Sequence, residues 1–221
     1  MDFVKGQVNL DEDILVVDKP VGWTSHDVVA KIRGELGKHE TRSTKLETKI
    51  GHGGTLDPFA TGVLLILVGK ATRRFEEIKT WDKEYVMTVK LGAATTTGDP
   101  EGEVTETRPV TGVKRERVER ALRDLTGFYQ QQVPAYSAVK VGGERLYALA
   151  REGKEVKLPR RQVEIKEIEL VDLQGLSLKV RVVCGSGTYM RQLAVDIGEK
   201  LDLPAHAAAL RRTRVGDYEL S

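Results

Sequence analysis

Residues 51–62 hold the side chain in this sequence that is best placed to do chemistry. They read Gly-His-Gly-Gly-Thr-Leu-Asp-Pro-Phe-Ala-Thr-Gly, so one carboxylate, Asp57, lies among small and turn-forming residues. Glycine permits positive φ angles and close approach of a ligand to the backbone, and a residue before proline is turned away from helical geometry. Asp57 is therefore either a reactive acid presented on a loop or a residue that caps a turn. The loop alone favours neither interpretation.

The neighbouring segments predict the elements that must position this loop. Residues 63–68 form a continuous apolar run of core character, and residues 13–18 read as a short buried strand. Thr24 or Ser25 is expected to cap a helix whose apolar residues recur at helical spacing. Those residues are Val28, Val29, Ile32 and Leu36. Residues 37–49 are polar and lack periodicity, which predicts a loop.

The rest of the chain predicts separated strands and helices without a regular βαβ rhythm. Apolar residues alternate over 84–91, which predicts a strand with one face formed by Tyr85, Met87, Val89 and Leu91. The further elements are two strands and three helices, at residues 163–171, 178–184, 114–126, 144–151 and 189–201. Because no internal repeat or clear linker divides the sequence, this pattern favours one α+β domain.

The composition is that of an ordinary globular protein. Of the 221 residues, 40% are hydrophobic and 31% are charged, and the formal net charge of +2 does not by itself indicate nucleic acid. The single cysteine, Cys184, excludes an internal disulfide framework, and the four histidines lack zinc-ligand spacing, so no metal is implied. There is no signal-like N-terminal pattern and no apolar run of about 20 residues. We therefore expect a soluble, cytoplasmic protein.

Five further motifs accompany the loop in a fixed order. They are Asp18-Lys19-Pro20; Lys83-Glu84-Tyr85 with Leu91-Gly92; Tyr136-Ser137-Ala138-Val139-Lys140, continuing from Leu146 to Gly153; Gly187-Thr188-Tyr189-Met190-Arg191; and Ala205-His206 through Leu210-Arg211-Arg212. Any one of them is a weak signal. Together and in this order they resemble the TruB family of tRNA pseudouridine synthases, over residues 13–220.

This resemblance implies a fold as well as an activity. We expect a single α+β pseudouridine-synthase-type domain over residues 1–221, with a mixed, mostly antiparallel central sheet flanked by helices and loops. Residues 131–161 resemble the family's thumb-like insertion, which we expect to be the least rigid part. Many relatives continue into a small C-terminal RNA-binding domain of the PUA type. Because the sequence stops at Ser221, we expect that domain to be absent.

The implied activity is that of an isomerase, a tRNA pseudouridine-55 synthase. Such an enzyme breaks the C–N glycosidic bond of a uridine in the T loop of tRNA, rotates the flipped-out base and forms a C–C bond. The resemblance implies no cofactor and no metal. The expected partner is the T-stem and loop of tRNA, with no protein partner and no membrane, and the protein is expected to be a monomer.

The resemblance also implies roles for six residues. Asp57 matches the family's essential aspartate, and the sequence leaves open whether it acts as a nucleophile or as a base. Arg191 matches its cationic partner. Three residues match the walls of the base pocket: Tyr85, Tyr189 and Leu210. His52 matches a histidine that fills the gap left by the flipped nucleotide. Without the resemblance, Tyr85 reads as a core aromatic and Arg191 as a solvated arginine.

A set of basic side chains is expected to grip phosphates as one face. Its members are Arg73, Arg74, Lys140, Arg145, Arg151, Arg160, Arg161, Arg211 and Arg212. Two rival functions stay open. One is a glycosidase or nucleosidase that uses Asp57, although such enzymes usually need a second carboxylate. The other is an RNA-binding or tRNA-chaperone module without turnover.

Overall fold

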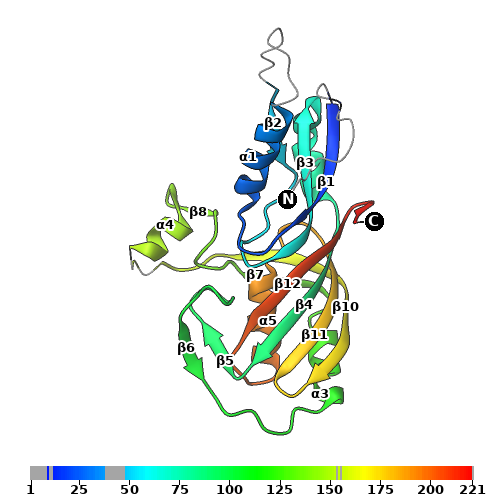
Figure 1. Cartoon of the computed structure of the whole chain (residues 1–221). Coiled ribbons are helices and arrows are strands. Elements are labelled where there is room, and N and C mark those ends of the chain that lie inside the picture. Colours follow the sequence, from blue (N-terminus) through cyan, green and yellow to red (C-terminus); the bar gives the residue numbers. More distant parts are fainter. Residues whose placement is uncertain (1–8, 10–11, 38–47, 153, 155, 221) are drawn as a thin grey trace. The chain divides into compact units, whose positions relative to one another are not determined.

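A computed structural model of the chain describes residues 9, 12–37, 48–152, 154 and 156–220. Most of the expected polar loop at 37–49 lies outside the described residues. By its internal contacts the chain divides into two compact units. Unit 1 comprises Met1–Tyr85 and Arg211–Ser221, and unit 2 comprises Val86–Leu210. Two strands, β4 (Lys83–Leu91) and β12 (Ala205–Val215), pass from one unit into the other (Figure 1).

Unit 1 is built around the apolar strand β3 (Thr61–Gly69). Its neighbours are β1 (Glu12–Lys19), which pairs with it antiparallel over its full length, and the short β2 (Ile50–His52), also antiparallel. The end of β12 pairs with the start of β3 in parallel, with Arg211 opposite Thr61 and Arg212 opposite Gly62. β12 continues into an antiparallel pair with β13 (Tyr218–Glu219). The loop that carries Asp57 connects β2 to β3.

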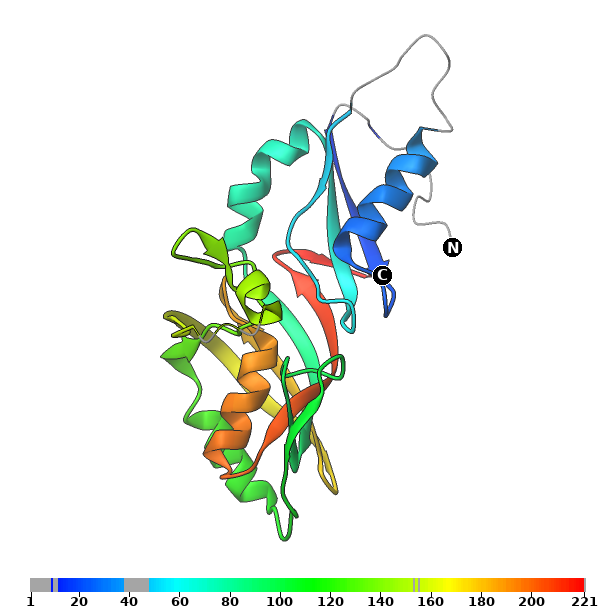
Figure 2. The same cartoon turned by 90° about the vertical axis from the view of Figure 1, so that its left-hand side faces the viewer.

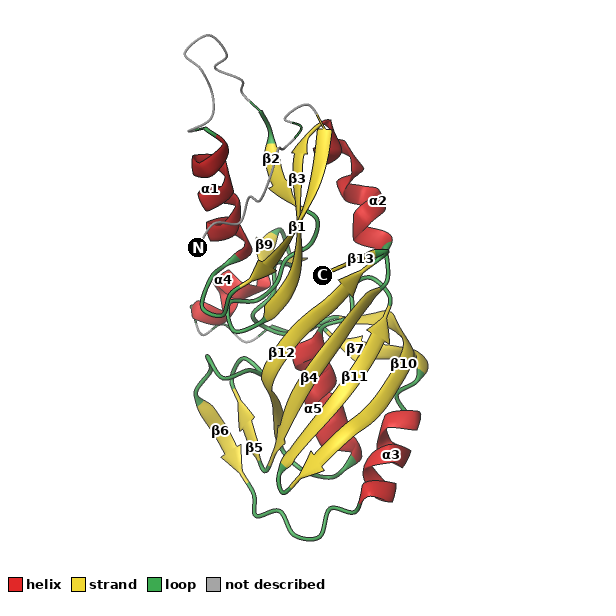
Figure 3. Ribbon diagram, turned by 45° about the vertical axis from the view of Figure 1, so that its right-hand side comes forward, coloured by secondary structure: helices red, strands yellow, loops and turns green. Residues whose placement is uncertain are grey.

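Helices cover both sides of these strands (Figure 3). On one side lies α1 (Ser25–Leu36), which begins with a capping box: the Thr24 hydroxyl accepts the Asp27 backbone N–H, and the Asp27 carboxylate accepts the Thr24 N–H. On the other side lie the 3-10 helix η1 (Lys70–Arg74) and α2 (Phe75–Thr80). The core under these two helices comprises Val63, Leu65, Leu67, Ala71, Ile78 and Val215.

Unit 2 contains a sheet in the order β12-β4-β11-β10-β7. Its longest member is β10 (Arg160–Gln174), which pairs antiparallel with β11 (Ser177–Cys184) with two register shifts. The edge strand β7 (Gly127–Gln132) pairs antiparallel with the start of β10. Against this sheet lie α5 (Met190–Lys200) and α3 (Arg115–Arg123), visible in Figure 2. The smaller elements are β5 (Ala93–Thr95), β6 (Val104–Thr107), β8 (Lys140–Val141), β9 (Glu144–Arg145) and α4 (Leu146–Arg151).

The expected fold class is confirmed: the chain is α+β with a mixed, mostly antiparallel sheet flanked by helices. One prediction was too long, since α3 ends at Arg123 and not at residue 126, although Leu125 is buried beyond its end. No helix among the described residues is long and apolar enough to cross a membrane. The thumb-like role of residues 131–161 stays a prediction.

Candidate active site

Asp57 is half-buried at the start of a tight turn between β2 and β3. The Ala60 N–H donates to the Asp57 carbonyl at 3.1 Å, and Pro58 occupies the second position of the turn, where its fixed φ angle is favourable. Asp57 does therefore begin a turn, as the plainer interpretation predicted. That role uses its backbone carbonyl and not its carboxylate.

The N-terminal part of unit 1 holds the peptide groups on both sides of Asp57. Ser25, at the start of α1, is buried; its hydroxyl accepts the Leu56 N–H at 2.9 Å and donates to the Leu56 carbonyl at 3.2 Å. The Pro58 carbonyl accepts the Gly22 N–H at 2.8 Å and the Lys19 ammonium at 3.2 Å. These bonds from segments far away in the sequence fix the backbone position of Asp57.

Lys19 is fully buried, and its ammonium group donates to main-chain oxygens. Besides the Pro58 carbonyl, it reaches the carbonyls of Pro20 at 2.9 Å and Trp23 at 2.5 Å. A buried ammonium group needs such acceptors, because an unpaired charge away from water is strongly unfavourable. Lys19 thus ties the end of β1 and the segment after it to Pro58 in the Asp57 turn.

Arg212 holds the other end of the loop. Its guanidinium donates to the carbonyls of Val63 at 2.7 Å, Gly54 at 3.2 Å and Thr55 at 3.4 Å. The sequence predicted a phosphate contact here. That prediction is wrong, because the side chain is 3% exposed and its donors face main-chain oxygens of unit 1. A run of arginines gives no sign of which one points inward, and here Arg212 does while Arg211 stays exposed.

Two glycines of the loop are required by packing. A Cβ atom on Gly62 would lie 2.1 Å from the Arg212 carbonyl oxygen, and Gly62 has a φ angle of +99°. A Cβ atom on Gly53 would lie 2.9 Å from the Ile78 side chain. A side chain on Gly51 would meet nothing within 4 Å. Gly53 and Gly62 are therefore needed for the close packing of the loop within unit 1, whereas Gly51 is not.

His52 is half-buried at the end of β2. Its ring meets that of His26 edge to face, with centroids 5.2 Å apart. Among the described residues, its buried Nδ1 atom has no hydrogen-bond partner. Desolvation is the main cause that lowers the pKa of His52 from its ordinary value, and the charges of His26 and Arg212 lower it further. His52 is therefore a neutral ring at pH 7.

Tyr85 and Leu210 are both buried strand residues. Tyr85 is 8% exposed on the alternating buried face of β4, and Leu210 is 6% exposed on β12. Tyr85 belongs to unit 1 with Asp57 and His52, whereas Leu210 belongs to unit 2 with Tyr189 and Arg191.

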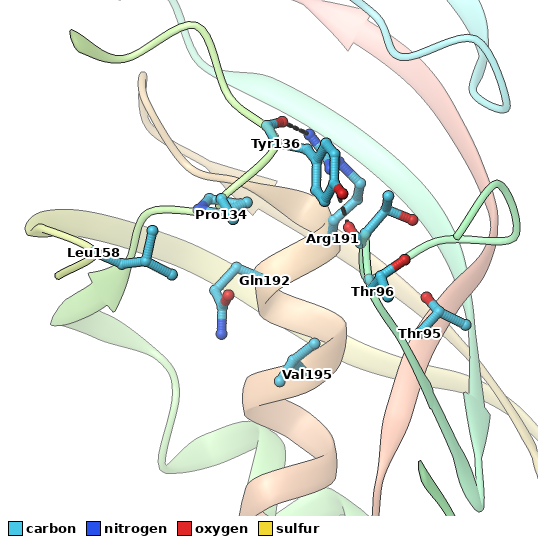
Figure 4. Close-up of a pocket in the computed structure, with 11 residues that line it drawn as sticks. Thr95, Thr96, Pro134, Tyr136, Leu158, Arg191, Gln192 and Val195 are labelled. Atoms are coloured by element: carbon cyan, nitrogen blue, oxygen red, sulfur yellow. Dashed lines mark hydrogen bonds between the residues drawn. The ribbon is translucent and has the colours of Figure 1, made fainter. Parts of the chain in front are cut away.

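Arg191 lies in the first turn of α5 and is 7% exposed, so the interpretation as a solvated arginine is wrong. Its guanidinium donates to the carbonyls of Thr97 at 3.0 Å and Tyr136 at 2.9 Å. Its Nε atom also lies 3.6 Å from the buried carboxylate of Asp99. Figure 4 shows Arg191 between these two segments, at one end of a cavity of about 150 Å³ that runs along α5 past Gln192 and Val195. Asp99 is a charge partner that the sequence did not predict.

Tyr189 occupies the N-cap position of α5 and is half-buried. Its backbone N–H donates to the side-chain oxygen of Gln131 at 2.8 Å. Gln131 was not predicted from the sequence, because three consecutive glutamines on β7 carry no sign of which one is buried. A period-two pattern with the buried Val133 is the signal that would have found it.

These features can support chemistry by a carboxylate. In unit 1 a half-buried acid lies on a loop whose backbone is held by three buried side chains. In unit 2 the start of one helix presents a buried arginine and a tyrosine. Among the described residues, no group of three or more His, Cys, Asp or Glu side chains is arranged to hold a metal ion.

Solved structures share this fold. The chain is similar to one in the crystal structure of a Cbf5-Nop10-Gar1 complex, with a TM-score of 0.71 and 31% identity. It is also similar to one in the structure of an H/ACA RNP bound to a substrate RNA containing 2'-deoxyuridine, with a TM-score of 0.67 and 28% identity. The matches cover 96% of this chain and 51% and 50% of those chains, so this chain spans about half of each.

The sequence comparisons define the class of protein as a pseudouridylate synthase, an isomerase that acts on RNA. Residues 41–190 match the family described as "TruB family pseudouridylate synthase (N terminal domain)". The chain belongs to the TruB family. It is 48% identical to the tRNA pseudouridine synthase B of Bacteroides fragilis, over all of this chain and 91% of that protein. It is 47% identical to that of Leifsonia xyli subsp. xyli, over 94% of this chain and 68% of that protein.

Proposed function

We propose that this pseudouridine synthase acts on tRNA and isomerises one uridine of the T loop. The relatives named tRNA pseudouridine synthase B support the choice of tRNA. The observation that carries the proposal is the Asp57 turn, whose carbonyl and amide groups are bonded on both sides by Ser25, Lys19 and Arg212. A carboxylate on so constrained a loop is preorganised to meet a substrate in one geometry.

The reaction needs one ionised carboxylate beside the ribose of the target uridine. The bond between C1′ and N1 breaks, the uracil rotates, and a bond forms between C1′ and C5. The hydrogen on C5 leaves as a proton, N1 gains one, and no electrons are gained or lost overall. Asp57 acts either as a nucleophile at C1′ or as a base towards a neighbouring ribose carbon.

The other five residues are proposed to receive the extruded base. Flipping a base out of folded RNA costs a few kcal/mol, and stacking on aromatic side chains recovers part of this free energy. We assign Tyr85, Tyr189 and Leu210 to the walls of the slot. We assign Arg191 to the positively charged side of the pocket, and His52, as a neutral ring, to the space that the base leaves.

The proposed partner is the T-stem and loop of tRNA, bound by the exposed members of the basic set. These are Arg73, Lys140, Arg145, Arg151, Arg160, Arg161 and Arg211. We propose that the enzyme works as a monomer in the cytoplasm, without a protein partner.

The test is release of tritium from a T-arm RNA labelled at C5 of uridine. Formation of the bond between C1′ and C5 expels that hydrogen, so each turnover releases one tritium. We expect release by the wild type and loss of at least about 1,000-fold in Asp57→Asn. The matched control is Asp217→Asn, which removes an exposed carboxylate from the same unit and is expected to keep full activity.

Three results contradict the proposal. RNA that binds tightly but releases no tritium indicates a binding or chaperone module. Free uracil in the supernatant indicates a glycosidase. Undiminished release by Asp57→Asn would remove Asp57 from the chemistry.

A further inference from the structure

Gln131 makes two hydrogen bonds to the backbone of one residue in the start of α5. It lies on β7 and is fully buried, whereas its neighbour Gln130 is exposed. The side-chain oxygen of Gln131 accepts the Tyr189 N–H at 2.8 Å, and its side-chain nitrogen donates to the Tyr189 carbonyl at 3.2 Å. A planar amide that meets the N–H and the C=O of the same residue restricts the rotation of that residue's backbone.

The orientation of this amide is fixed by a relay that ends on Asp196. The Tyr129 hydroxyl donates to Asp196 Oδ2 at 2.8 Å, so its oxygen is left to accept a hydrogen bond from Gln131 Nε2 at 2.7 Å. Gln131 Nε2 also lies 3.3 Å from the same carboxylate oxygen. Because a carboxylate only accepts hydrogen bonds, the NH₂ group of Gln131 must be the end that faces Asp196. The side-chain oxygen of Gln131 is then the end that faces the Tyr189 N–H.

Asp196 is itself held in place. Its other oxygen, Oδ1, accepts a hydrogen bond from Gln192 Nε2 at 2.8 Å. Burial raises its pKa, and the hydrogen bonds from Gln192, Tyr129 and Gln131 oppose this shift. Since Asp196 and Tyr189 lie on the same helix, the relay joins β7 to the start and the middle of α5.

The start of α5 depends on this support. Tyr189 is the N-cap residue and makes no capping hydrogen bond with its own side chain. The N–H groups at a helix start lack partners within the helix, so an outside acceptor is needed to fix them. Gln131 supplies that acceptor to Tyr189, the residue directly before the first turn of α5, which carries Arg191.

We propose that Gln131 is a positioning residue of the synthase, which holds the Tyr189 backbone and thereby sets where Tyr189 and Arg191 meet the substrate. This inference rests on the proposed function, since it takes both residues as part of the substrate pocket. Gln131 touches no reacting atom in this assignment.

The first test replaces Gln131 by leucine, whose side chain is of similar size but has no hydrogen-bonding groups. We expect kcat for tritium release to fall about 10- to 100-fold, because small displacements of positioned groups have effects of this size. The KM for the T-arm is expected to change less than about threefold, since the phosphate contacts remain. The matched control, Gln130→Leu, makes the same change one residue along on the exposed side of β7 and is expected to match the wild type.

The second test is Gln131→Glu, which keeps the acceptor for the Tyr189 N–H. When ionised, the introduced carboxylate would place its second oxygen against the Asp196 carboxylate. The two negative charges repel each other, so the pair binds one shared proton more readily than two separate carboxylates would. Other titratable groups that bear on this cluster are Tyr129, Arg160 and Cys184, and Glu199 and Lys200 line the same cavity as Asp196. When protonated, the introduced group donates again, so we expect the kcat of this variant relative to the wild type to rise as the pH falls from about 8 to 6. The same ratio for Gln131→Leu is expected to stay flat.

Failure of this inference is separable from failure of the proposed function. A wild type that releases no tritium refutes the proposed function; the positioning role is then decided by hydrogen exchange of the Tyr189 amide. Faster exchange in Gln131→Leu than in Gln130→Leu supports the role, and equal exchange overturns it. With an active wild type, a kcat for Gln131→Leu within about threefold of the wild-type value overturns the inference, as does a flat pH ratio for Gln131→Glu.

Discussion

Replacing Arg212 by methionine should destabilise the protein far more than the same change at Arg211. Arg212 is buried and donates to three main-chain carbonyls of the Asp57 loop and of β3. Arg211 pairs with Asp18 through two bonds of 3.1 and 2.9 Å, but 44% of its side chain and 52% of that of Asp18 are exposed. The two variants thus remove the same charge from adjacent residues with different surroundings.

The expected magnitudes follow from these contacts. The bond from Arg212 to the Val63 carbonyl is short, and a charged donor of this kind contributes about 1.5–3 kcal/mol. The two longer bonds add roughly 1 kcal/mol together, so we expect Arg212→Met to lower the free energy of unfolding by about 3 kcal/mol. An exposed pair such as Arg211 with Asp18 contributes about 0–1 kcal/mol.

Urea unfolding, followed by the fluorescence of Trp23 and Trp81, measures both variants. With a slope of about 3 kcal/mol per molar urea, the midpoint of Arg212→Met should fall by roughly 1 M. The midpoint of Arg211→Met should fall by less than about 0.3 M. If the two midpoints fall equally, the guanidinium of Arg212 does not stabilise the loop and the reasoning is refuted.

Three further predictions concern the same loop. In the folded chain the pKa of His52 lies below its ordinary value of 6.5. As the pH falls below that value, His52 therefore binds a proton in the unfolded chain more readily than in the folded chain. The wild type should lose stability there by up to about 1.4 kcal/mol per pH unit relative to His52→Asn, and parallel pH profiles of the urea midpoint would contradict this. Gly62→Ala should lower the free energy of unfolding by about 3 kcal/mol or more, because its Cβ would overlap the Arg212 backbone, whereas Gly51→Ala should lower it by less than about 1 kcal/mol; equal thermal midpoints would refute the packing argument. Lys19→Met removes the ammonium donor from three carbonyls, of which Pro58 keeps the Gly22 N–H, and should lower the free energy of unfolding by about 2–4 kcal/mol. An unchanged chemical unfolding midpoint would show that water replaces the ammonium.

Local chemistry made much of the fold predictable. A hydroxyl before an apolar helical pattern indicated a cap at Thr24 or Ser25, and the structure has Thr24 in a capping box. The alternation over 84–91 identified β4 because a strand with one buried face needs that pattern. β12 was not recognised as a strand, since its alanines favour helix and only its pairing with β3 and β4 makes it extended.

The residues of the candidate site likewise divide into those that the sequence predicted and those that it did not. Asp57 was found because its neighbours in sequence form its loop, and the burial of Arg191, Tyr85 and Leu210 agrees with pocket roles that stay predictions. Gln131 was missed because its partners, Tyr189 and Asp196, lie 58 and 65 residues away. The period-two pattern with Val133 could have indicated that Gln131 is buried, but it could not have identified these distant partners.

The contact between Arg212 and the Asp57 loop also sets an order of events during biosynthesis. The hydrogen bonds that fix Gly54 and Thr55 come from a residue made 158 and 157 positions later. A nascent chain can form β1, α1 and β3 early, but its Asp57 turn lacks this support until Arg212 has left the ribosome. The reactive loop therefore gains this support only after the chain has been made as far as Arg212.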